Sequence, residues 1–218
     1  MAAVIFDLDG TLVDSAPDIH AAVNRLLADV AEAALSAETV KSFIGNGVPT
    51  LVARVLAACG HGPDPARQAD WQAGFLRHYE ADSATLTQLY PGVTEALSAL
   101  DKKGHQLALC TNKPELPARK ILRAFGLDGF FPVVIGGDSL PQRKPDPAPL
   151  LAAAARLAGP ALFVGDSEVD AETALAAQVP FLLFTEGYRR APVHALPHAA
   201  RFGRFSDLPA LVARCAAD

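Results

Sequence analysis

This 218-residue chain contains few cysteines. It also lacks a strong charge imbalance and a long apolar run. The three cysteines, Cys59, Cys110 and Cys215, are odd in number and lack CxxC spacing, which excludes a disulfide framework and disfavours a zinc site. The net charge of −5, with no long basic run, excludes the electrostatic footprint of a nucleic-acid binder. We therefore expect a protein of the reducing cytoplasm that has no DNA or RNA partner.

Membrane and targeting signals are also missing from the sequence. The apolar run at residues 2–6 follows no basic segment and is broken by Asp7, so it is far too short for a membrane span. With 50% hydrophobic and 20% charged residues, the composition is that of a globular protein able to bury a core. We expect no membrane partner, and a monomer or homodimer.

Short apolar runs rich in branched residues alternate with helical patterns along much of the chain. The runs cover residues 4–6, 106–110, 133–135, 161–164 and 181–184. Helical patterns lie at 93–102, before Gly126, and at 148–157, with prolines at or near their first turns. Continuous apolar strands that alternate with helices indicate a parallel sheet buried on both faces. The sequence therefore predicts a doubly wound α/β fold.

The gap between the first two predicted strands is too long for one crossover. It spans about a hundred residues, whereas one strand-helix-strand unit takes roughly 30. Helical patterns fill it at residues 19–30, 37–43, 48–58 and 66–79. We expect an inserted four-helix domain over residues 16–85, carried by an α/β core domain made of residues 1–15 and 86–218.

Acidic residues follow two of the predicted strands. Asp7 and Asp9 come after the first, and the alternation of strand side chains places both on the same side of its carboxyl end. Ligands bind at that end in open parallel sheets. Two close carboxylates repel each other unless a cation or a proton lies between them, and Mg²⁺ prefers oxygen ligands. Asp166 and Asp170 bring further carboxylates to the same kind of edge.

Two other segments supply hydrogen-bond donors and positive charge. Thr111 and Asn112 end a strand ahead of a helix whose free N–H groups favour anions, and Lys144 lies in a proline-rich loop ahead of another helix. Together these segments predict a metal site, a phosphate cradle and a cation. The alternative at this point is that the Asp, Thr and Asn residues only cap helices and turns.

The four segments resemble the motifs of the haloacid dehalogenase superfamily, in the expected order and with an insert between the first and second. The matching residues are Asp7-Leu8-Asp9-Gly10-Thr11, Thr111-Asn112, Lys144-Pro145 and Gly165-Asp166-Ser167-Glu168-Val169-Asp170. Residues 12–19, 43–48 and 187–190 are in addition similar to the phosphoglycolate phosphatases. The resemblance implies a Rossmann-like core, a helical cap, and hydrolysis of a small phosphomonoester, with 2-phosphoglycolate as the leading substrate.

The resemblance also implies a role for each motif residue. Asp7 would attack phosphorus and form an aspartyl-phosphate. Asp9 would act first as general acid and then as general base. The implied phosphate ligands are Thr111, Asn112 and Lys144. The implied Mg²⁺ ligands are Asp7, the backbone carbonyl of Asp9, and Asp166, with Asp170 supporting them.

Several alternatives stay open. An acid at Asp9 disfavours dehalogenation, since a leaving halide needs no proton. A phosphosugar mutase of the β-phosphoglucomutase type shares the fold, and a phosphatase of pyrophosphate or other small phosphoesters shares the chemistry. A receiver-type signalling module also combines Asp, Thr and Lys in a parallel sheet, but it would not need the insert. The cap loop Gly45-Asn46-Gly47 either presents N–H groups to a substrate carboxylate or is a plain turn.

Overall fold

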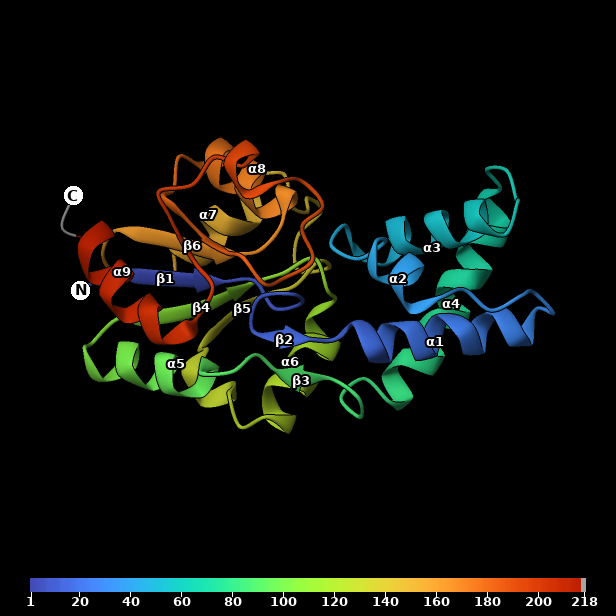
Figure 1. The fold of residues 1–218 in the computed structure, drawn as a ribbon, viewed down its shortest axis with the longest axis horizontal. Helices are drawn as coiled ribbons and strands as arrows, with labels where there is room; N and C mark the ends of the chain where they lie inside the picture. Colours follow the sequence, from blue (N-terminus) through green and yellow to red (C-terminus); the bar gives the residue numbers. More distant parts are fainter. Residues whose placement is uncertain (217–218) are drawn as a thin grey trace. The chain divides into compact units, whose positions relative to one another are not determined.

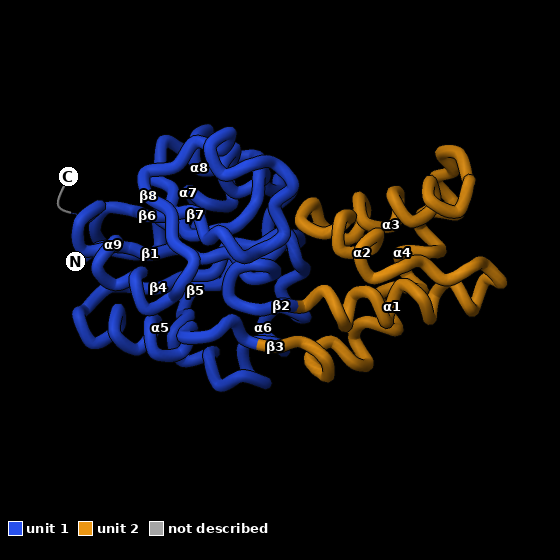
Figure 2. The backbone as a smooth tube through the Cα atoms, in the orientation of Figure 1, with its two compact units in different colours: residues 1–14, 89–218 blue, residues 15–88 orange. Residues whose placement is uncertain are grey.

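The computed structural model describes residues 1–216, and the chain divides into two compact units (Figure 2). Unit 2 is Ser15–Gln88, and unit 1 consists of Met1–Asp14 and the chain from Leu89 onward. Unit 2 ends three residues later than the insert that the sequence predicts, which spans residues 16–85. The physical reason is Asp18, whose carboxylate accepts hydrogen bonds from the backbone N–H groups of Leu86 at 2.9 Å and Thr87 at 2.8 Å.

The centre of unit 1 is a parallel sheet. Its strands are β1 (Ala3–Phe6), β4 (Gln106–Cys110), β5 (Val133–Ile135), β6 (Ala161–Gly165), β7 (Phe181–Phe184) and β8 (Ala200–Phe202). They follow the order β5-β4-β1-β6-β7-β8, and every neighbouring pair is parallel. Strands β5, β4, β1 and β6 are labelled in Figure 1. Because the first strand lies inside the sheet and later strands are added on both sides, the doubly wound prediction is confirmed.

Helices cover both faces of this sheet. They are α5 (Val93–Lys102), α6 (Glu115–Ala124), α7 (Ala148–Ala154), α8 (Glu168–Ala177) and α9 (Leu208–Cys215), with 3₁₀ turns at Asp128–Phe130, Val193–Ala195 and Phe205–Asp207. Helices α7 and α8 pack on one face, and α5 and α9 lie on the other (Figure 1). Alternate strand residues thus face two apolar layers, which explains the continuous apolar runs. Among residues 1–216, no helix is both long and apolar enough to cross a membrane.

Three short strands are absent from the sequence prediction. Two of them, β2 (Val13–Asp14) and β3 (Gln88–Leu89), have two residues each, which is too short to show a period. The third, β8, is an edge strand in which Ala200 and Phe202 are buried while Arg201 is exposed. A single alternation of this kind gives no apolar run, so only the neighbouring strand reveals it.

Unit 2 consists of four helices around an apolar core of its own. They are α1 (Ala16–Asp29), α2 (Ala37–Lys41), α3 (Gly47–Ala58) and α4 (Pro65–Ala81). Ile19, Val23 and Leu27 of α1 are buried in one cluster with Val55 of α3 and Phe75 of α4. Their four-residue spacing is that of an amphipathic helix. The four helices lie where the sequence pattern predicts them, with ends that differ by at most three residues.

Candidate active site

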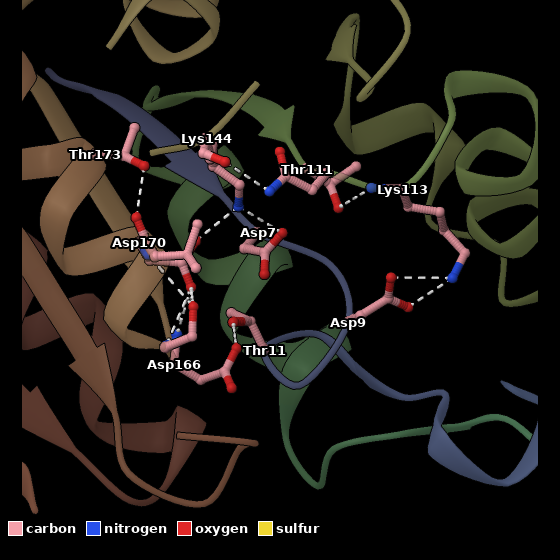
Figure 3. A network of polar contacts seen from close by, with 12 residues as sticks. Asp7, Asp9, Thr11, Thr111, Lys113, Lys144, Asp166, Asp170 and Thr173 are labelled. Carbon is pink, nitrogen blue, oxygen red and sulfur yellow. Dashed lines mark hydrogen bonds and ion pairs between the residues drawn. The ribbon is translucent and has the colours of Figure 1, made fainter. Parts of the chain in front are cut away.

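The predicted site segments of unit 1 meet at the carboxyl edge of its sheet (Figure 3). Strands β1, β4 and β6 are neighbours in parallel register. The residues that follow them, Asp7, Thr111 and Asp166, therefore emerge side by side. Lys144, from the loop before α7, and Asp170, from the first turn of α8, point into the same space (Figure 3).

Asp7, Asp166 and Asp170 form a compact group of buried carboxylates. One oxygen from each lies within 4.8 Å of the other two, and all three residues are 7% exposed or less. Burial raises the pKa of Asp7 to about 6, although the Lys144 ammonium acts in the opposite direction. Burial, together with the charges of Asp170 and Asp7, raises the pKa of Asp166 well above its ordinary value. Full ionisation of the group therefore requires additional positive charge.

Lys144 supplies one positive charge. Its Nζ donates to Asp170 Oδ1 at 2.6 Å, pairs with Asp7 Oδ1 at 2.9 Å, and lies 5.3 Å from the centre of the Phe163 ring. Burial disfavours the ammonium ion, but the carboxylates of Asp170 and Asp7 outweigh burial and raise the pKa of Lys144, which stays protonated. Three carboxylates and one ammonium have a formal charge of −2. One divalent cation would neutralise it.

Two loops hold Asp166. Thr11 Oγ1 donates to Asp166 Oδ1 at 2.8 Å, and the backbone N–H of Tyr188 donates to Oδ2 at 2.5 Å. Glycines allow this close approach, since a Cβ would lie 2.3 Å from Asp166 Oδ2 at Gly187 and 2.5 Å from it at Gly10. The orientation of this carboxylate is therefore determined by the loops after β1 and β7.

Asp170 ties Lys144 to the start of α8. Its Oδ2 accepts from the Ser167 hydroxyl at 2.6 Å and from the Ser167 N–H at 3.1 Å, completing a capping box. Its Oδ1 accepts from Lys144. Asp170 is more heavily engaged than Asp166, because its Oδ1 pairs with the Lys144 ammonium and its Oδ2 also accepts from the backbone N–H of Asp166 at 3.2 Å. Asp170 therefore suits a supporting position behind a metal ion better than a direct ligand position.

Asp9 does not join the carboxylate group. Both of its oxygens accept from Lys113 Nζ, at 2.8 and 3.0 Å, and Figure 3 shows this pair beside the group formed by Asp7, Asp166 and Asp170. Because β1 ends at Phe6, the strand alternation does not itself place Asp9, and the projection of Asp7 and Asp9 from the same side stays a prediction. A contribution of Asp9 to a metal through its backbone carbonyl stays a prediction.

Lys113 is a site residue that the sequence analysis missed. It is only 7% exposed, and its backbone N–H donates to Thr111 Oγ1 at 3.2 Å. The available signal was a lysine directly after Thr111 and Asn112 at the end of an apolar strand. A buried lysine at such an edge needs an anionic partner, and here Asp9 is that partner.

Thr111 and Asn112 lie at the carboxyl edge of the sheet, where their side chains form hydrogen bonds with the backbone of neighbouring site segments. Thr111 Oγ1 accepts from the backbone of Lys113, and Asn112 Nδ2 donates to the backbone carbonyl of Lys144 at 2.9 Å. Asn112 thereby connects the loop after β4 to the loop that carries Lys144. Binding of phosphate by Thr111, Asn112 and Lys144 stays a prediction.

Comparison with known proteins identifies the family of this chain. The model of the haloacid dehalogenase-like hydrolases matches residues 1–178. The chain belongs to this family. Phosphoglycolate phosphatase from Cereibacter sphaeroides (strain ATCC 17029 / ATH 2.4.9) is 58% identical to it, over 98% of this chain and 99% of the relative.

Two further proteins are similar to this hydrolase over nearly its whole length. Phosphoglycolate phosphatase from Rhodobacter capsulatus is 47% identical over 96% of both chains. The crystal structure of a predicted phosphoglycolate phosphatase from Haemophilus somnus 129PT superimposes with a TM-score of 0.90 at 34% identity. That superposition covers 96% of this chain and 97% of the other, so the likeness includes both units.

The donor set of this hydrolase fits Mg²⁺. The three clustered side chains offer carboxylate oxygen only, which hard divalent cations prefer over nitrogen or sulfur. The formal charge of −2 and the raised pKa values of Asp7 and Asp166 both favour a bound cation. Asp7 and Asp166 are therefore the side chains able to hold it, with Asp170 behind them.

In unit 2 of this hydrolase, Gly45-Asn46-Gly47 leads into α3, with Asn46 as the N-cap and Gly47 as the first helical residue. Gly45 and Gly47 have φ angles of 113° and 80°, in the region that favours glycine. Arg54 of α3 donates from Nη1 to the carbonyl of Phe43 at 2.9 Å and from Nη2 to Asn46 Oδ1 at 3.1 Å. The turn is therefore held in shape by a guanidinium of its own unit.

Proposed function

We propose that this hydrolase is a Mg²⁺-dependent phosphomonoesterase that converts 2-phosphoglycolate and water into glycolate and phosphate. The observation that carries the proposal is the buried Asp7 carboxylate, 2.9 Å from the Lys144 ammonium and clustered with two further carboxylates. A carboxylate can act as a nucleophile toward phosphorus when nearby cations attract the phosphate dianion. The relatives at 58% and 47% identity are phosphoglycolate phosphatases, which supports the choice of substrate.

The proposed reaction has two displacement steps at phosphorus. In the first, a carboxylate oxygen of Asp7 forms a bond to phosphorus while the bond to the glycolate oxygen breaks, and Asp9 gives that oxygen its proton. In the second, Asp9 takes a proton from water, the water oxygen attacks phosphorus, and the bond to Asp7 breaks. One water is consumed for each phosphate released, and both aspartates return to their starting states.

Lys113 positions Asp9 before this cycle. The ion pair at 2.8 Å gives the Asp9 carboxylate one defined direction, and only 13% of that side chain is exposed. To act as the general acid, Asp9 must carry a proton, taken from solvent before the first turnover and from the attacking water in each later one, and it must exchange a hydrogen bond from Lys113 for one to the leaving oxygen. We therefore assign Lys113 as a positioning residue for the general acid.

The remaining charged and polar groups bind the phosphate. Lys144, with Thr111 and Asn112, would contact the transferring oxygens. Mg²⁺ would be held by Asp7, Asp166 and the backbone carbonyl of Asp9, with Asp170 in support. When bound there, Mg²⁺ supplies positive charge that offsets the repulsion between Asp7 and the substrate dianion.

Unit 2 is proposed to act as the cap that selects the substrate. Its turn at Gly45-Asn46-Gly47 leads into α3, whose first N–H groups favour a negative charge. The carboxylate of 2-phosphoglycolate is a charge of that kind, and phosphomonoesters such as β-glucose 1-phosphate lack it. This turn is therefore the proposed element for distinguishing 2-phosphoglycolate from esters that are larger or have no carboxylate.

A kinetic panel tests this function. Phosphate release is measured with Mg²⁺ for 2-phosphoglycolate, pyrophosphate, a nucleotide and β-glucose 1-phosphate, with Asp7→Asn as the blank. We expect the highest kcat/KM for 2-phosphoglycolate and no turnover by the blank. If 2-phosphoglycolate ranks among the poorest substrates, the specificity is wrong while the phosphatase remains. Phosphoryl transfer to a sugar phosphate without phosphate release would favour a mutase. A phosphoprotein that persists without turnover would favour a receiver module.

The proposal also covers the cellular compartment and the oligomeric state of the enzyme. Cys59, Cys110 and Cys215 are all free thiols, as expected of a protein in the reducing cytoplasm. We propose a cytoplasmic enzyme that acts as a monomer or homodimer on a small phosphorylated metabolite. Light scattering on the eluted protein distinguishes the two assemblies, and a larger assembly would contradict both.

A further inference from the structure

The loop that follows β7 contacts the carboxylate cluster, yet the proposed reaction gives its side chains no role. Its Tyr188 is half-buried, and the Tyr188 backbone N–H donates to Asp166 Oδ2 at 2.5 Å. The neighbouring Gly187 lies so close to Asp166 that a Cβ there would be 2.3 Å from its Oδ2 and from the Gly10 carbonyl oxygen. A small displacement of this loop would therefore change the direction of the Asp166 carboxylate.

The Tyr188 phenol anchors the loop at one end. Its hydroxyl donates to Asp14 Oδ1 at 2.7 Å, across 174 positions of sequence. Burial and the hydrogen bond to Asp14 raise the pKa of Tyr188, so the phenol stays a donor. Asp14 itself does not cap α1, because the N-cap of that helix is Ser15. The hydrogen bond from Tyr188 is thus a contact through which Asp14 can act on the site.

A second anchor lies beyond Tyr188. Glu168 Oε1 accepts from the backbone N–H groups of Arg190 at 2.7 Å and Ala191 at 2.5 Å, which ties the far end of the loop to α8. The Arg189 guanidinium also donates to the Thr185 carbonyl within the same loop. The N–H that holds Asp166 therefore lies between two fixed points, of which the Tyr188 phenol is one.

We propose that Tyr188 is a positioning residue of the metal site: its hydrogen bond to Asp14 fixes the N–H that orients Asp166, and so sets the affinity for the divalent cation. The inference deepens the proposed function, on which it rests in taking Asp166 as a metal ligand. The Tyr188–Asp14 pair acts only by orienting Asp166. Its loss should therefore reduce cation affinity more than it reduces kcat once the cation is bound. Residues behind metal ligands typically affect metal affinity by about 10–100-fold.

Cation binding without substrate tests the inference. Mn²⁺ binding is measured by electron paramagnetic resonance and Mg²⁺ binding by calorimetry, on the full chain. We expect Tyr188→Phe to weaken both by about 10-fold and to leave kcat at saturating Mg²⁺ within about twofold of wild type. Tyr79→Phe is the matched control, since it removes a hydroxyl from a tyrosine that is 3% exposed in the core of unit 2. Unchanged cation binding by Tyr188→Phe would overturn the inference.

Variants at Asp14 separate orientation from general stability. Asp14→Asn keeps an oxygen that can accept from the phenol and should bind cations nearly as wild type does, whereas Asp14→Ala should match Tyr188→Phe. The double variant Tyr188→Phe/Asp14→Ala should be no weaker than either single variant; additive losses would contradict the inference. If Tyr188→Phe fails to fold, the two Asp14 variants decide the question. If Asp166→Asn retains full cation binding, the proposed metal site fails instead.

Discussion

The two aspartates of the first motif have different cationic partners, and this gives them separable effects. Asp7 faces Lys144, while Asp9 faces Lys113. Asp9→Asn retains an oxygen for Lys113 but cannot transfer a proton, so kcat for 2-phosphoglycolate should fall by about 10²–10⁴-fold. With p-nitrophenyl phosphate, whose leaving group needs no proton, this variant should release up to one equivalent of nitrophenol in a rapid burst.

The burst follows because the second step, which needs Asp9 as a base, becomes rate-limiting and the aspartyl-phosphate accumulates. Stopped-flow absorbance measures the burst, and phosphate release measures the slow step. Asp7→Asn should show neither phase. Equal slowing of both phases in Asp9→Asn would contradict the assignment of Asp9 as the acid and base.

The raised pKa of Asp7 predicts a pH-dependent loss of stability in the metal-free protein. The pKa is about 6 in the folded state against 3.8 for the ordinary carboxyl. Stability from this group is therefore fully present below about pH 4 and is lost as the pH rises through about 6, by up to about 3 kcal/mol. Asp7→Asn does not ionise, so in EDTA its advantage over wild type should grow over that range.

Urea unfolding of both proteins in EDTA, from about pH 4 to about pH 7, measures this difference. Saturating Mg²⁺ should reduce the difference in unfolding free energy between the two proteins near neutral pH, because a cation stabilises the ionised wild-type cluster more than the variant. A difference between the two proteins that is constant with pH would show that burial of the Asp7 charge does not destabilise the fold.

At the scale of elements, the loops after β1 and β7 act together on Asp166. A Cβ at Gly187 would lie 2.3 Å from both Asp166 Oδ2 and the Gly10 carbonyl oxygen. Gly187→Ala must therefore push the two loops apart, with an expected loss of about 1–3 kcal/mol in unfolding free energy. Weaker Mn²⁺ binding should accompany that loss.

The control for this loop is Gly129→Ala, because nothing lies within 4 Å of a Cβ at Gly129. It should match wild type in urea unfolding and in Mn²⁺ titration. If Gly187→Ala also matches wild type in both measurements, the close approach of the loops does not orient Asp166.

Strands and helices with a clear hydrophobic pattern were predictable from the sequence, whereas contacts made by loops were not. Strand β1 is buried on both faces and reads as an apolar run, whereas edge strand β8 alternates only once. Asp7 and Asp166 were predictable because a strand end places them. The partners Lys113 and Tyr188 were not, since turns determine which donor meets which carboxylate, and no sequence period describes a turn.

At the scale of the whole molecule, the proposed function places the chemistry in unit 1 and the selection of substrate in unit 2, and each unit has a core of its own. The carboxylate cluster lies wholly in unit 1, and the Gly45-Asn46-Gly47 turn lies wholly in unit 2. Variants of unit 2 should therefore change the substrate preference of the enzyme without changing cation binding. Arg54 offers the test, because its guanidinium holds the turn through Phe43 and Asn46.

Arg54→Met should raise KM for 2-phosphoglycolate by about 10-fold, since loss of both hydrogen bonds lets the turn relax and weakens its interaction with the substrate carboxylate. For p-nitrophenyl phosphate, which has no carboxylate, KM should change less than about twofold. Arg77→Met makes the same substitution at an exposed arginine of α4 and should leave both values unchanged. Steady-state kinetics with the two substrates decide the matter: an equal rise in both KM values would mean that the turn supports the unit as a whole and does not recognise the carboxylate.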